Sequence, residues 1–312
     1  MKVVLFFFLL GIFQVNAQNY PNKPIKLLVP FPAGSATDHI ARLTGSQLQE
    51  AMGQPVVVEN KPGAQGGIAA AEVAKAAPDG YTLLMTTNTP QAANVSLFKK
   101  LNYDPVKDFS PIVRLGTTSF MLMVKPDFPS RNLKEFLSYA KDKNFSAGYG
   151  SAGSQVSLSM LKAMAKLDVV EVPYKGIPQA ITDTLGGQLA FTFVDLGNAL
   201  AQAKGGKLRG LAVTSLKRTS LAPDMPALAE ELPGYELIAW FALMAPANTP
   251  ADVVQKVHDV VIKGLARADV KEKYAGIGID PAPMNPAELG RFIQSEIAHW
   301  AKLAKIAGLQ PE

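Results

Sequence analysis

The chain has 312 residues, no cysteine and a formal net charge of +5 at pH 7. The lack of cysteine excludes disulfide bonds, thiolate metal sites and a cysteine nucleophile, and the length predicts two domains that each bury a core. The Lys and Arg residues are spread along the chain without a basic block, so nucleic acid is not an expected partner.

The first residues have the pattern of an export signal. Lys2 precedes an apolar stretch from Val3 to Phe13, and Val15 and Ala17 have the spacing of a signal-peptidase site. We therefore expect a signal peptide at residues 1–17, cleaved after Ala17. Its apolar stretch is too short to span a bilayer, which takes roughly 20 residues.

A strand, a tight loop and a helix are predicted between Ile25 and Met52. An apolar run ends at Val29, the loop reads PFPAGSAT, and apolar residues then recur at helical spacing. Because the first N–H groups of a helix have no partner within it, such a loop is a cradle for a carboxylate or phosphate. The cradle would be formed by Ala33, Gly34, Ser35 and Thr37. The alternative is that Gly34 only makes the turn, while Thr37 and Asp38 only cap the helix.

Strands and helices continue to alternate, with strands expected at 56–59 and 81–87 and a helix at 68–76. This order predicts a mainly parallel sheet covered by helices on both faces. Ligands of such sheets lie at the carboxyl ends of the strands, which makes Thr87 and Asn88 candidate binding residues. Alternatively, both residues cap the next helix.

A second strand-loop-helix unit is predicted over residues 145–166, which read FSAGYGSAGSQVSLSMLKAMAK. It repeats the first unit, so the two loops could hold the two ends of one elongated ligand. The segment GYGSAG also matches the dinucleotide pattern G-x-G-x-x-G, but the next strand does not end in the acidic residue that this pattern requires. We expect no nicotinamide or other cofactor.

A secreted serine hydrolase is the alternative function, with Ser151 or Ser154 as nucleophile. The nucleophile pattern G-x-S-x-G is absent, because Tyr149 stands where its first glycine would be. The histidines, His39, His258 and His299, fall on predicted helices and do not cluster as metal ligands do. We therefore expect neither catalysis nor a metal site.

Three residues further along the chain are also candidates for ligand contact. Lys175 follows a predicted strand over 169–174 and either pairs with a carboxylate or is solvated. Asp195 ends a strand predicted over 189–194 and could accept hydrogen bonds from a ligand hydroxyl or amine, from water or from backbone amides. Trp240 lies in the apolar run 237–244 and packs either on the hydrocarbon part of a ligand or in the core.

The end of the chain is predicted to be helical, with helices that begin near Pro250 and Pro286. Helices alone cannot form a sheet, so this segment should pack back onto the first domain. Strands near 120–125 and 237–244 would then cross between two α/β lobes, with a hinge between them and a ligand cleft. We place lobe 1 at residues 18–122 plus 243–312 and lobe 2 at residues 123–242.

Several segments together resemble the Bug family, the periplasmic substrate-binding receptors of tripartite tricarboxylate transporters. They are YPNKPIKLLVPFPAGSATDHIAR, VVVENKPGAQGGIAAAEVAKAAPDGYTLL, VPYKGIPQAITDTLGGQLAFTFVD, KLRGLAVTS, LPGYELIAWFALMAPANTP and EIAHWAKLAKIAGL. The resemblance covers nearly the whole chain after the signal. It implies a Venus-flytrap protein in which each lobe is a mainly parallel sheet flanked by helices.

The resemblance also implies which residues touch a carboxylate ligand. The main contacts would come from Ala33, Gly34, Ser35 and Thr37 in the first loop and from Ser151, Gly153 and Ser154 in the second, with Thr87, Lys175 and Asp195 secondary. This chain departs from the family in having Ser35 where a second glycine is usual. Its second loop is also shorter than usual, so Gln155 or Ser157 can add hydrogen bonds.

From these patterns we predict a periplasmic receptor, monomeric and without catalytic activity, that captures a carboxylate-bearing small molecule. It would deliver this ligand to a transporter with a large and a small membrane subunit. A receptor that signals to a sensor protein has the same sequence features, so that role stays open beside uptake.

Overall fold

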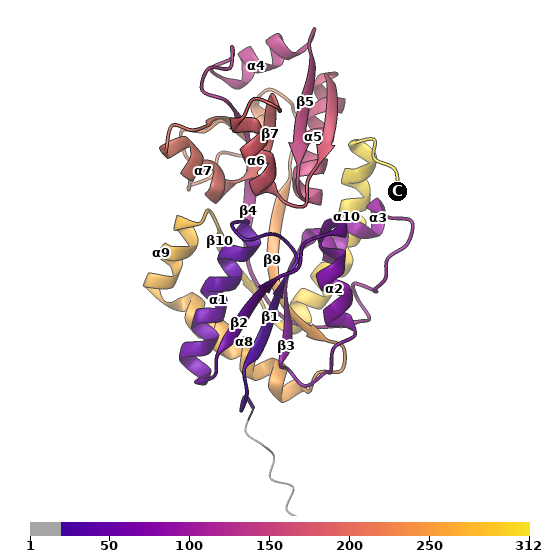
Figure 1. The fold of residues 1–312 in the computed structure, drawn as a ribbon, viewed down its shortest axis with the longest axis vertical. Coiled ribbons are helices and arrows are strands. Elements are labelled where there is room, and N and C mark those ends of the chain that lie inside the picture. The colour runs from indigo at the N-terminus through magenta and orange to yellow at the C-terminus, as the bar shows by residue number, and fades with distance from the viewer. Residues whose placement is uncertain (1–19) are drawn as a thin grey trace, which may run out of the picture.

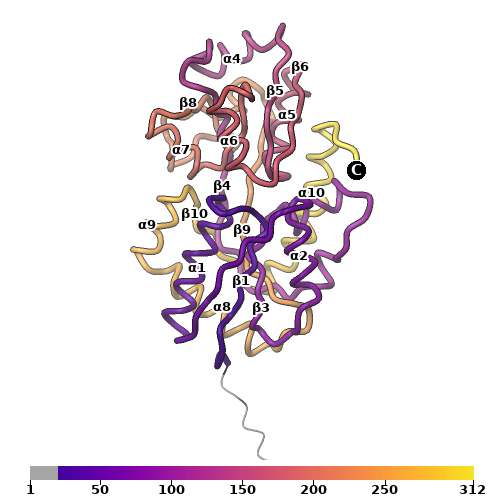
Figure 2. Tube along the Cα trace, in the orientation of Figure 1, coloured from indigo at the N-terminus to yellow at the C-terminus, as the bar shows by residue number. Residues whose placement is uncertain are grey.

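The computed structural model describes residues 20–312, so the predicted signal peptide lies outside the described residues. Two groups of helices and strands are stacked along the long axis of the molecule (Figure 1). The lower group contains both the early and the late parts of the chain, and the middle of the chain forms the upper group (Figure 2). This arrangement confirms the predicted two-lobed α/β fold.

Lobe 1, the lower group, is built on parallel strands that pair in the order β2-β1-β3. Its strands are β1 (Ile25–Val29), β2 (Val56–Asn60) and β3 (Thr82–Thr87). Its helices are α1 (Ala36–Met52), α2 (Gly67–Ala74) and α3 (Asn94–Leu97), with a 3₁₀ turn η1 (Ala64–Gly66) and a π turn η2 (Thr89–Ala93). The predicted strand-helix alternation is thus present in this half of the molecule.

Lobe 2, the upper group, repeats the parallel arrangement in the order β7-β5-β6. Its strands are β5 (Asn144–Tyr149), β6 (Asp168–Pro173), β7 (Phe191–Asp195) and β8 (Arg209–Val213). Its helices are α4 (Leu133–Ala140), α5 (Ala152–Ala165), α6 (Ile177–Leu185) and α7 (Leu196–Lys204), followed by a 3₁₀ turn η3 (Leu228–Glu230).

Two long antiparallel strands, β4 (Phe109–Val124) and β9 (Ile238–Pro246), run through both lobes. Up to Ser119, β4 pairs with β9, and from Phe120 onward it pairs with β7 and β8. The change of partner at Ser119 marks the passage between lobes, close to the predicted crossings. The lobe limits at 122 and 242 stay predictions.

The last part of the chain packs on lobe 1, as expected. It contains α8 (Ala251–Ala266), α9 (Ala268–Gly276), β10 (Asp280–Met284) and α10 (Pro286–Ile306). The expectation of helices alone was wrong, because β10 pairs antiparallel with β4. The sequence of β10, DPAPM, does not read as a strand, because proline has no N–H to donate to a neighbouring strand. Prolines in a sheet are confined mainly to edge strands.

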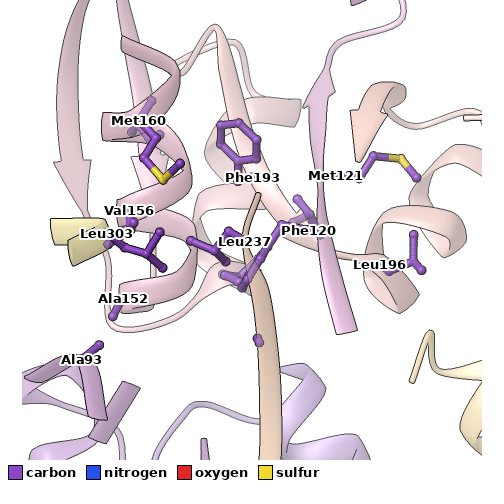
Figure 3. Packing of buried hydrophobic residues seen from close by; sticks show 14 of the residues in the cluster. Ala93, Phe120, Met121, Ala152, Val156, Met160, Phe193, Leu196, Leu237 and Leu303 are labelled. Atoms are coloured by element: carbon purple, nitrogen blue, oxygen red, sulfur yellow. The ribbon is translucent and has the colours of Figure 1, made fainter. Parts of the chain in front are cut away.

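Buried side chains lie on both faces of the lobe 1 sheet. Leu27 and Val29 of β1 face α1 and α8, whereas Leu28 joins a second cluster with α2 and α10. That second cluster continues into lobe 2, where Leu303 of α10 lies next to Val156 of α5 (Figure 3). The alternation of inward and outward side chains along a strand explains how one strand serves both clusters.

Candidate functional site

A cavity lies between the two lobes, where the loops before α1, α5 and α7 meet the end of β3 and the crossing strands. The space between its lining atoms, counted together with the part that is open to solvent, is about 400 Å³. Its polar lining residues are Ser35, Thr37, Thr87, Asn88, Thr89, Thr118, Ser151 and Asp195. Its other lining residues are Phe31, Ala36, Phe120, Gly150, Ile177, Ala239 and Phe241. Within residues 20–312, this lining contains no Lys, Arg or His.

The first loop is held by the side chains of Ser35 and Asp38. Ser35 caps α1, and its Oγ accepts a hydrogen bond of 3.2 Å from the backbone N–H of Asp38. The Asp38 carboxylate accepts a bond of 3.0 Å from the N–H of Gly34, which has a φ of 80° that favours glycine. These bonds leave the N–H groups of Ala36 and Thr37 as the unpaired donors of the first turn, at the wall of the cavity.

The Asp38 carboxylate also binds side chains outside the loop. It accepts a hydrogen bond of 3.0 Å from Asn60 Nδ2 and forms a salt bridge of 2.9 Å with Arg42. Burial by itself would raise the pKa of Asp38, but the hydrogen bonds from Arg42, Gly34 and Asn60 hold it below its ordinary value. Asp38 is thus ionised at neutral pH, and Arg42 balances its charge behind the cradle.

At the end of β3, Thr87 and Asn88 behave differently. The Thr87 hydroxyl accepts a hydrogen bond of 3.1 Å from the N–H of Thr89, so it supports the turn as the capping alternative proposes. Asn88 is 1% exposed, makes no capping bond, and its Nδ2 has no hydrogen-bond partner among the described residues. Because a buried donor without a partner is costly, Asn88 is a donor that a ligand can satisfy.

The second loop mostly satisfies its own polar groups. Ser151 caps α5 in a capping box with Ser154, whose Oγ accepts from the N–H of Gly150 at 3.0 Å and of Ser151 at 3.1 Å. The Ser157 hydroxyl donates to the carbonyl oxygen of Gly153 at 2.8 Å. Among these predicted contacts only Ser151 lines the cavity, and Gly153, Ser154 and Ser157 shape the loop behind it.

Asp195 lines the cavity at the start of α7 and is 3% exposed. Its Oδ1 accepts from the N–H of Asn198 at 3.2 Å and its Oδ2 from Asn198 Nδ2 at 3.1 Å. Burial raises the pKa of Asp195 above its ordinary value, although these bonds and the charge of His39 on α1 act in the opposite direction. It is thus a carboxyl group without a cationic side chain bonded to it.

Besides Gly153, Ser154 and Ser157, five predicted contacts do not line the cavity, and they are Ala33, Gly34, Gln155, Lys175 and Trp240. Ala33 is exposed, Gly34 contributes its backbone to the loop, and Lys175 is exposed in a depression near Tyr149. The expectation for Trp240 is corrected, since its ring packs on Phe292 and its Nε1 donates to Glu296 of α10 at 2.7 Å. The core-packing alternative therefore describes Trp240.

The aromatic lining was missed from the sequence. Phe31 comes from the first loop, Phe120 from β4 and Phe241 from β9. One signal could have found part of it. Because side chains alternate along a strand, a Trp240 that packs in the core places Ala239 and Phe241 on the opposite face of β9, where they can line the cavity. Phe120 gives no such signal, since it stands in an unbroken apolar run.

The two lobes touch each other around the cavity. Asn198 Nδ2 of lobe 2 donates to the carbonyl oxygen of Gly34 at 3.1 Å, and Gln65 Nε2 of lobe 1 donates to Gln155 Oε1 at 2.7 Å. A Cβ atom added to Gly176 would lie 2.5 Å from Cδ of Pro32 in the first loop. The structure therefore has the lobes closed on each other.

The hydrogen bonds of the Ser151 hydroxyl lead to Ser154, at 3.3 Å to its N–H and 3.2 Å to its Oγ. A Ser-His-Asp hydrolase would instead have a histidine beside the nucleophile, and no described histidine lines the cavity. In the described part of the chain, no three His, Asp or Glu side chains gather as metal ligands would. None of its helices is both long enough and apolar enough to cross a membrane.

A sequence model of the TctC family, described as the tripartite tricarboxylate transporter family receptor, matches residues 40–309. The chain belongs to this family. The TctC family consists of solute receptors and is not a family of enzymes. The chain is 33% identical to the protein BugT of Bordetella pertussis over 302 residues, which is 94% of this chain and 92% of BugT.

Two solved structures resemble this TctC protein over most of its length. The structure of R. palustris Rpa4515 with adipate has a TM-score of 0.92 and 32% identity, and the match covers 94% of this chain and 100% of that one. MatC from Rhodopseudomonas palustris with bound malate has a TM-score of 0.84 and 33% identity, covering 91% of this chain and 99% of MatC. The predicted family and the periplasmic-binding-protein fold are thus confirmed.

Proposed function

We propose that this protein captures a carboxylate-bearing small molecule in the interlobe cavity and delivers it to the membrane subunits of a tripartite transporter. The observation that carries the proposal is that the unpaired N–H groups of Ala36 and Thr37 and the free Nδ2 of Asn88 all belong to one cavity between the lobes. Oriented N–H donors at a helix start hold a carboxylate without a Lys or Arg partner.

The second loop is the proposed partner for the other end of the ligand. The N–H groups of Ala152 and Gly153 are left over in the first turn of α5, since Ser151 Oγ takes that of Ser154. Between the two helix starts, Phe31, Phe120 and Phe241 offer an apolar wall for a hydrocarbon chain. Adipate and malate, bound by the two similar structures, are both short dicarboxylates.

A thermal-shift screen of aliphatic and aromatic mono-, di- and tricarboxylates tests the binding step. A ligand at 100 times its dissociation constant should add roughly 2.7 kcal/mol to the free energy of unfolding. Closure around the ligand should also reduce the radius of gyration in small-angle scattering. If no carboxylate shifts the melting temperature, the proposed substrate class is wrong.

Asn88→Asp tests whether the site is this cavity. The change keeps the shape of the side chain but replaces the free donor with an anionic acceptor, so the shift should be lost while the protein stays folded. Asn102→Asp is the matched control, because it adds the same charge at an exposed position. A shift that survives Asn88→Asp would place the ligand elsewhere.

Delivery and export require separate measurements. Cells with the membrane subunits should take up the identified ligand only when this chain is present, and a signalling receptor would instead leave uptake unchanged. We propose a periplasmic monomer cleaved after Ala17, so the exported protein should begin at Gln18 in N-terminal sequencing. Its mass in light scattering should be that of a single chain.

A further inference from the structure

A second surface joins the two lobes, outside the cavity. It consists of two adjoining depressions that share Ala64 and Phe98 in their linings. The first depression lies on lobe 1, and the second continues onto lobe 2, on the side of the molecule where α2, α3 and α5 are seen in Figure 1. We call the two together the junction surface. The lining residues used below are Ala64, Gln65, Ile68, Phe98 and Lys100 of lobe 1 and Lys175 of lobe 2.

The lobe 1 part of the junction surface exposes large apolar side chains. Ile68 of α2 is 52% exposed, and Val95 of α3, which ends just before Phe98, is 40% exposed. Phe98 and Leu101 are half-buried and line the same depression as Ile68. Single apolar residues on a surface need no explanation, but several around one depression indicate a site for a protein partner.

Lysines surround the same depressions. Lys100 lines the first depression and follows Lys99 in the chain, and Lys175 lines the second depression from lobe 2. All three are exposed, and their side chains make no hydrogen bond or salt bridge among residues 20–312. The acidic residue of the two linings is Glu312. The excess of positive charge beside apolar groups is complementary to a segment that carries acidic and apolar side chains.

The backbone where the two depressions meet has an uncommon conformation. Ala64 and Gln65 have φ angles of 47° and 50°, in the left-handed region that residues other than glycine rarely adopt. The buried Asn94 holds them there, because its Nδ2 donates to the carbonyl oxygen of Gln65 at 3.1 Å. Strained positions of this kind concentrate at functional sites. The cavity does not account for them, since neither residue lines it.

The junction surface is continuous because the lobes are closed. Gln65 Nε2 donates to Gln155 Oε1 of lobe 2 at 2.7 Å. If the lobes moved apart, Lys175 would leave Ile68 and Phe98, and a segment lying across both depressions would lose part of its contacts. A partner at this surface therefore binds the closed protein more tightly than the open one.

We propose that the junction surface is where the closed protein docks on the transporter, and that it takes an exposed segment of the membrane subunits with apolar and acidic side chains. The apolar side chains enter the depression beside Ile68 and Phe98, and the acidic ones pair with Lys100 and Lys175. A partner that needs both lobes distinguishes a closed, loaded receptor from an open, empty one. This inference rests on the proposed function, because it requires delivery to membrane subunits.

Uptake into proteoliposomes that contain both membrane subunits tests the lobe 1 part. The substrate is the labelled carboxylate with the largest thermal shift, and the readout is the concentration of this protein that gives half-maximal uptake. Ile68→Glu should raise that concentration about tenfold or more, the loss expected when a central apolar contact becomes charged. Val57→Glu on β2 is the matched control, since Val57 is 54% exposed and lies outside the junction surface. Calorimetry should show unchanged ligand affinity for both variants.

Lys175→Glu tests the lobe 2 part in the same assay. It should also raise the half-maximal concentration, and added salt should weaken docking of the unmodified protein more than docking of this variant. Lys134→Glu on α4 is the matched control, because it makes the same charge change at another exposed position of lobe 2. Ligand affinity should again stay unchanged, since neither lysine lines the cavity.

The outcomes separate this inference from the proposed function. If Ile68→Glu and Lys175→Glu both support uptake at the unmodified concentration, docking occurs elsewhere while delivery stands. An effect of Ile68→Glu alone would show a partner that contacts only lobe 1, which overturns the dependence on closure. Binding to phosphatidylglycerol vesicles without the subunits, abolished by Lys175→Glu, would assign the surface to lipid. If the unmodified protein supports no uptake, the proposed delivery fails and the inference fails with it.

Discussion

The two loops that begin α1 and α5 have the same design but different anchors. In each, a side chain from the first turn of the helix accepts a hydrogen bond from a loop amide: Asp38 from Gly34, and Ser154 from Gly150. Ser154 completes its bonds within its own loop, whereas Asp38 also binds Asn60 at the end of β2. The first loop is therefore fixed to the lobe 1 sheet, and the second is self-contained.

This difference shows that the same loop geometry can be held by a charged side chain, Asp38, or by a neutral one, Ser154. A neutral serine needs only its neighbours, but the buried Asp38 needs Arg42 and Asn60 to keep its charge. The first loop thus depends on contacts far apart in the sequence. The predictions below test whether that dependence makes it the more fragile of the two.

Asp38→Ala should have the largest effect. It leaves Arg42 without its buried partner and takes one acceptor from each of two half-buried donors, Gly34 N–H and Asn60 Nδ2, although Asn60 Nδ2 keeps its bond to the carbonyl oxygen of Phe31. We expect a loss of about 3 kcal/mol in the free energy of unfolding. Urea denaturation at pH 7 measures it, and a loss under about 1 kcal/mol would contradict the anchoring role.

The stability difference between the unmodified protein and Asp38→Ala should also depend on pH. Because the folded pKa of Asp38 lies below its ordinary value of 3.8, its stabilising contribution is complete above 3.8 and is lost as pH falls through the folded pKa. The difference in stability between the unmodified protein and Asp38→Ala should therefore shrink below that pH. A difference that stays constant in acid would mean that Asp38 does not act through its charge.

Ser154→Ala should cost less, about 1 to 2 kcal/mol, because the bonds it removes are neutral and local. Thermal and urea unfolding measure the loss, with Ser138→Ala at an exposed position of α4 as the control. If Ser154→Ala destabilises the protein as much as Asp38→Ala does, the two loops are equally anchored.

Gly176→Ala tests the outer side of the first loop, where Pro32 contacts lobe 2. The added Cβ would lie 2.5 Å from Pro32 Cδ with the lobes closed, while the extended φ of −174° suits any residue. We expect about a tenfold loss of ligand affinity, or 1.4 kcal/mol, with little change in the stability of the free protein. Gly276→Ala, which meets no atom within 4 Å, is the control.

Gln155→Ala should have the smallest effect on ligand affinity. It tests the contact between the second loop and lobe 1. It removes the hydrogen bond of 2.7 Å with Gln65, which joins the two lobes. We expect ligand affinity to fall by about 0.5 to 1 kcal/mol, measured by calorimetry with the same ligand. A loss larger than that of Gly176→Ala would show that the polar contact, rather than the steric one, controls closure.

Much of the site could be predicted from the sequence because it is local. Ser35 and Ser151 are caps at the start of amphipathic helices, and Asn88 and Asp195 follow apolar strands, so short-range patterns locate all of these residues. Contacts far apart in the sequence could not be predicted in this way: Trp240 packs against α10, where Glu296 accepts its N–H. The hydroxyls of Ser154 and Ser157 instead donate to nearby carbonyl oxygens of their own loop, a choice that a capping pattern leaves open.

The sequence by itself determined the family, the alternation of strands and helices before the C-terminal segment, and the loops that begin α1 and α5. Hydrophobic periodicity, glycines and capping residues act within a few positions, so these features need no knowledge of the rest of the chain. Only the tertiary structure decided which side chains share the cavity, that β10 joins β4, and that Asp195 lies beside Gly34. Those relations depend on which strand faces meet and on how the lobes close, and residues distant in the sequence fix both.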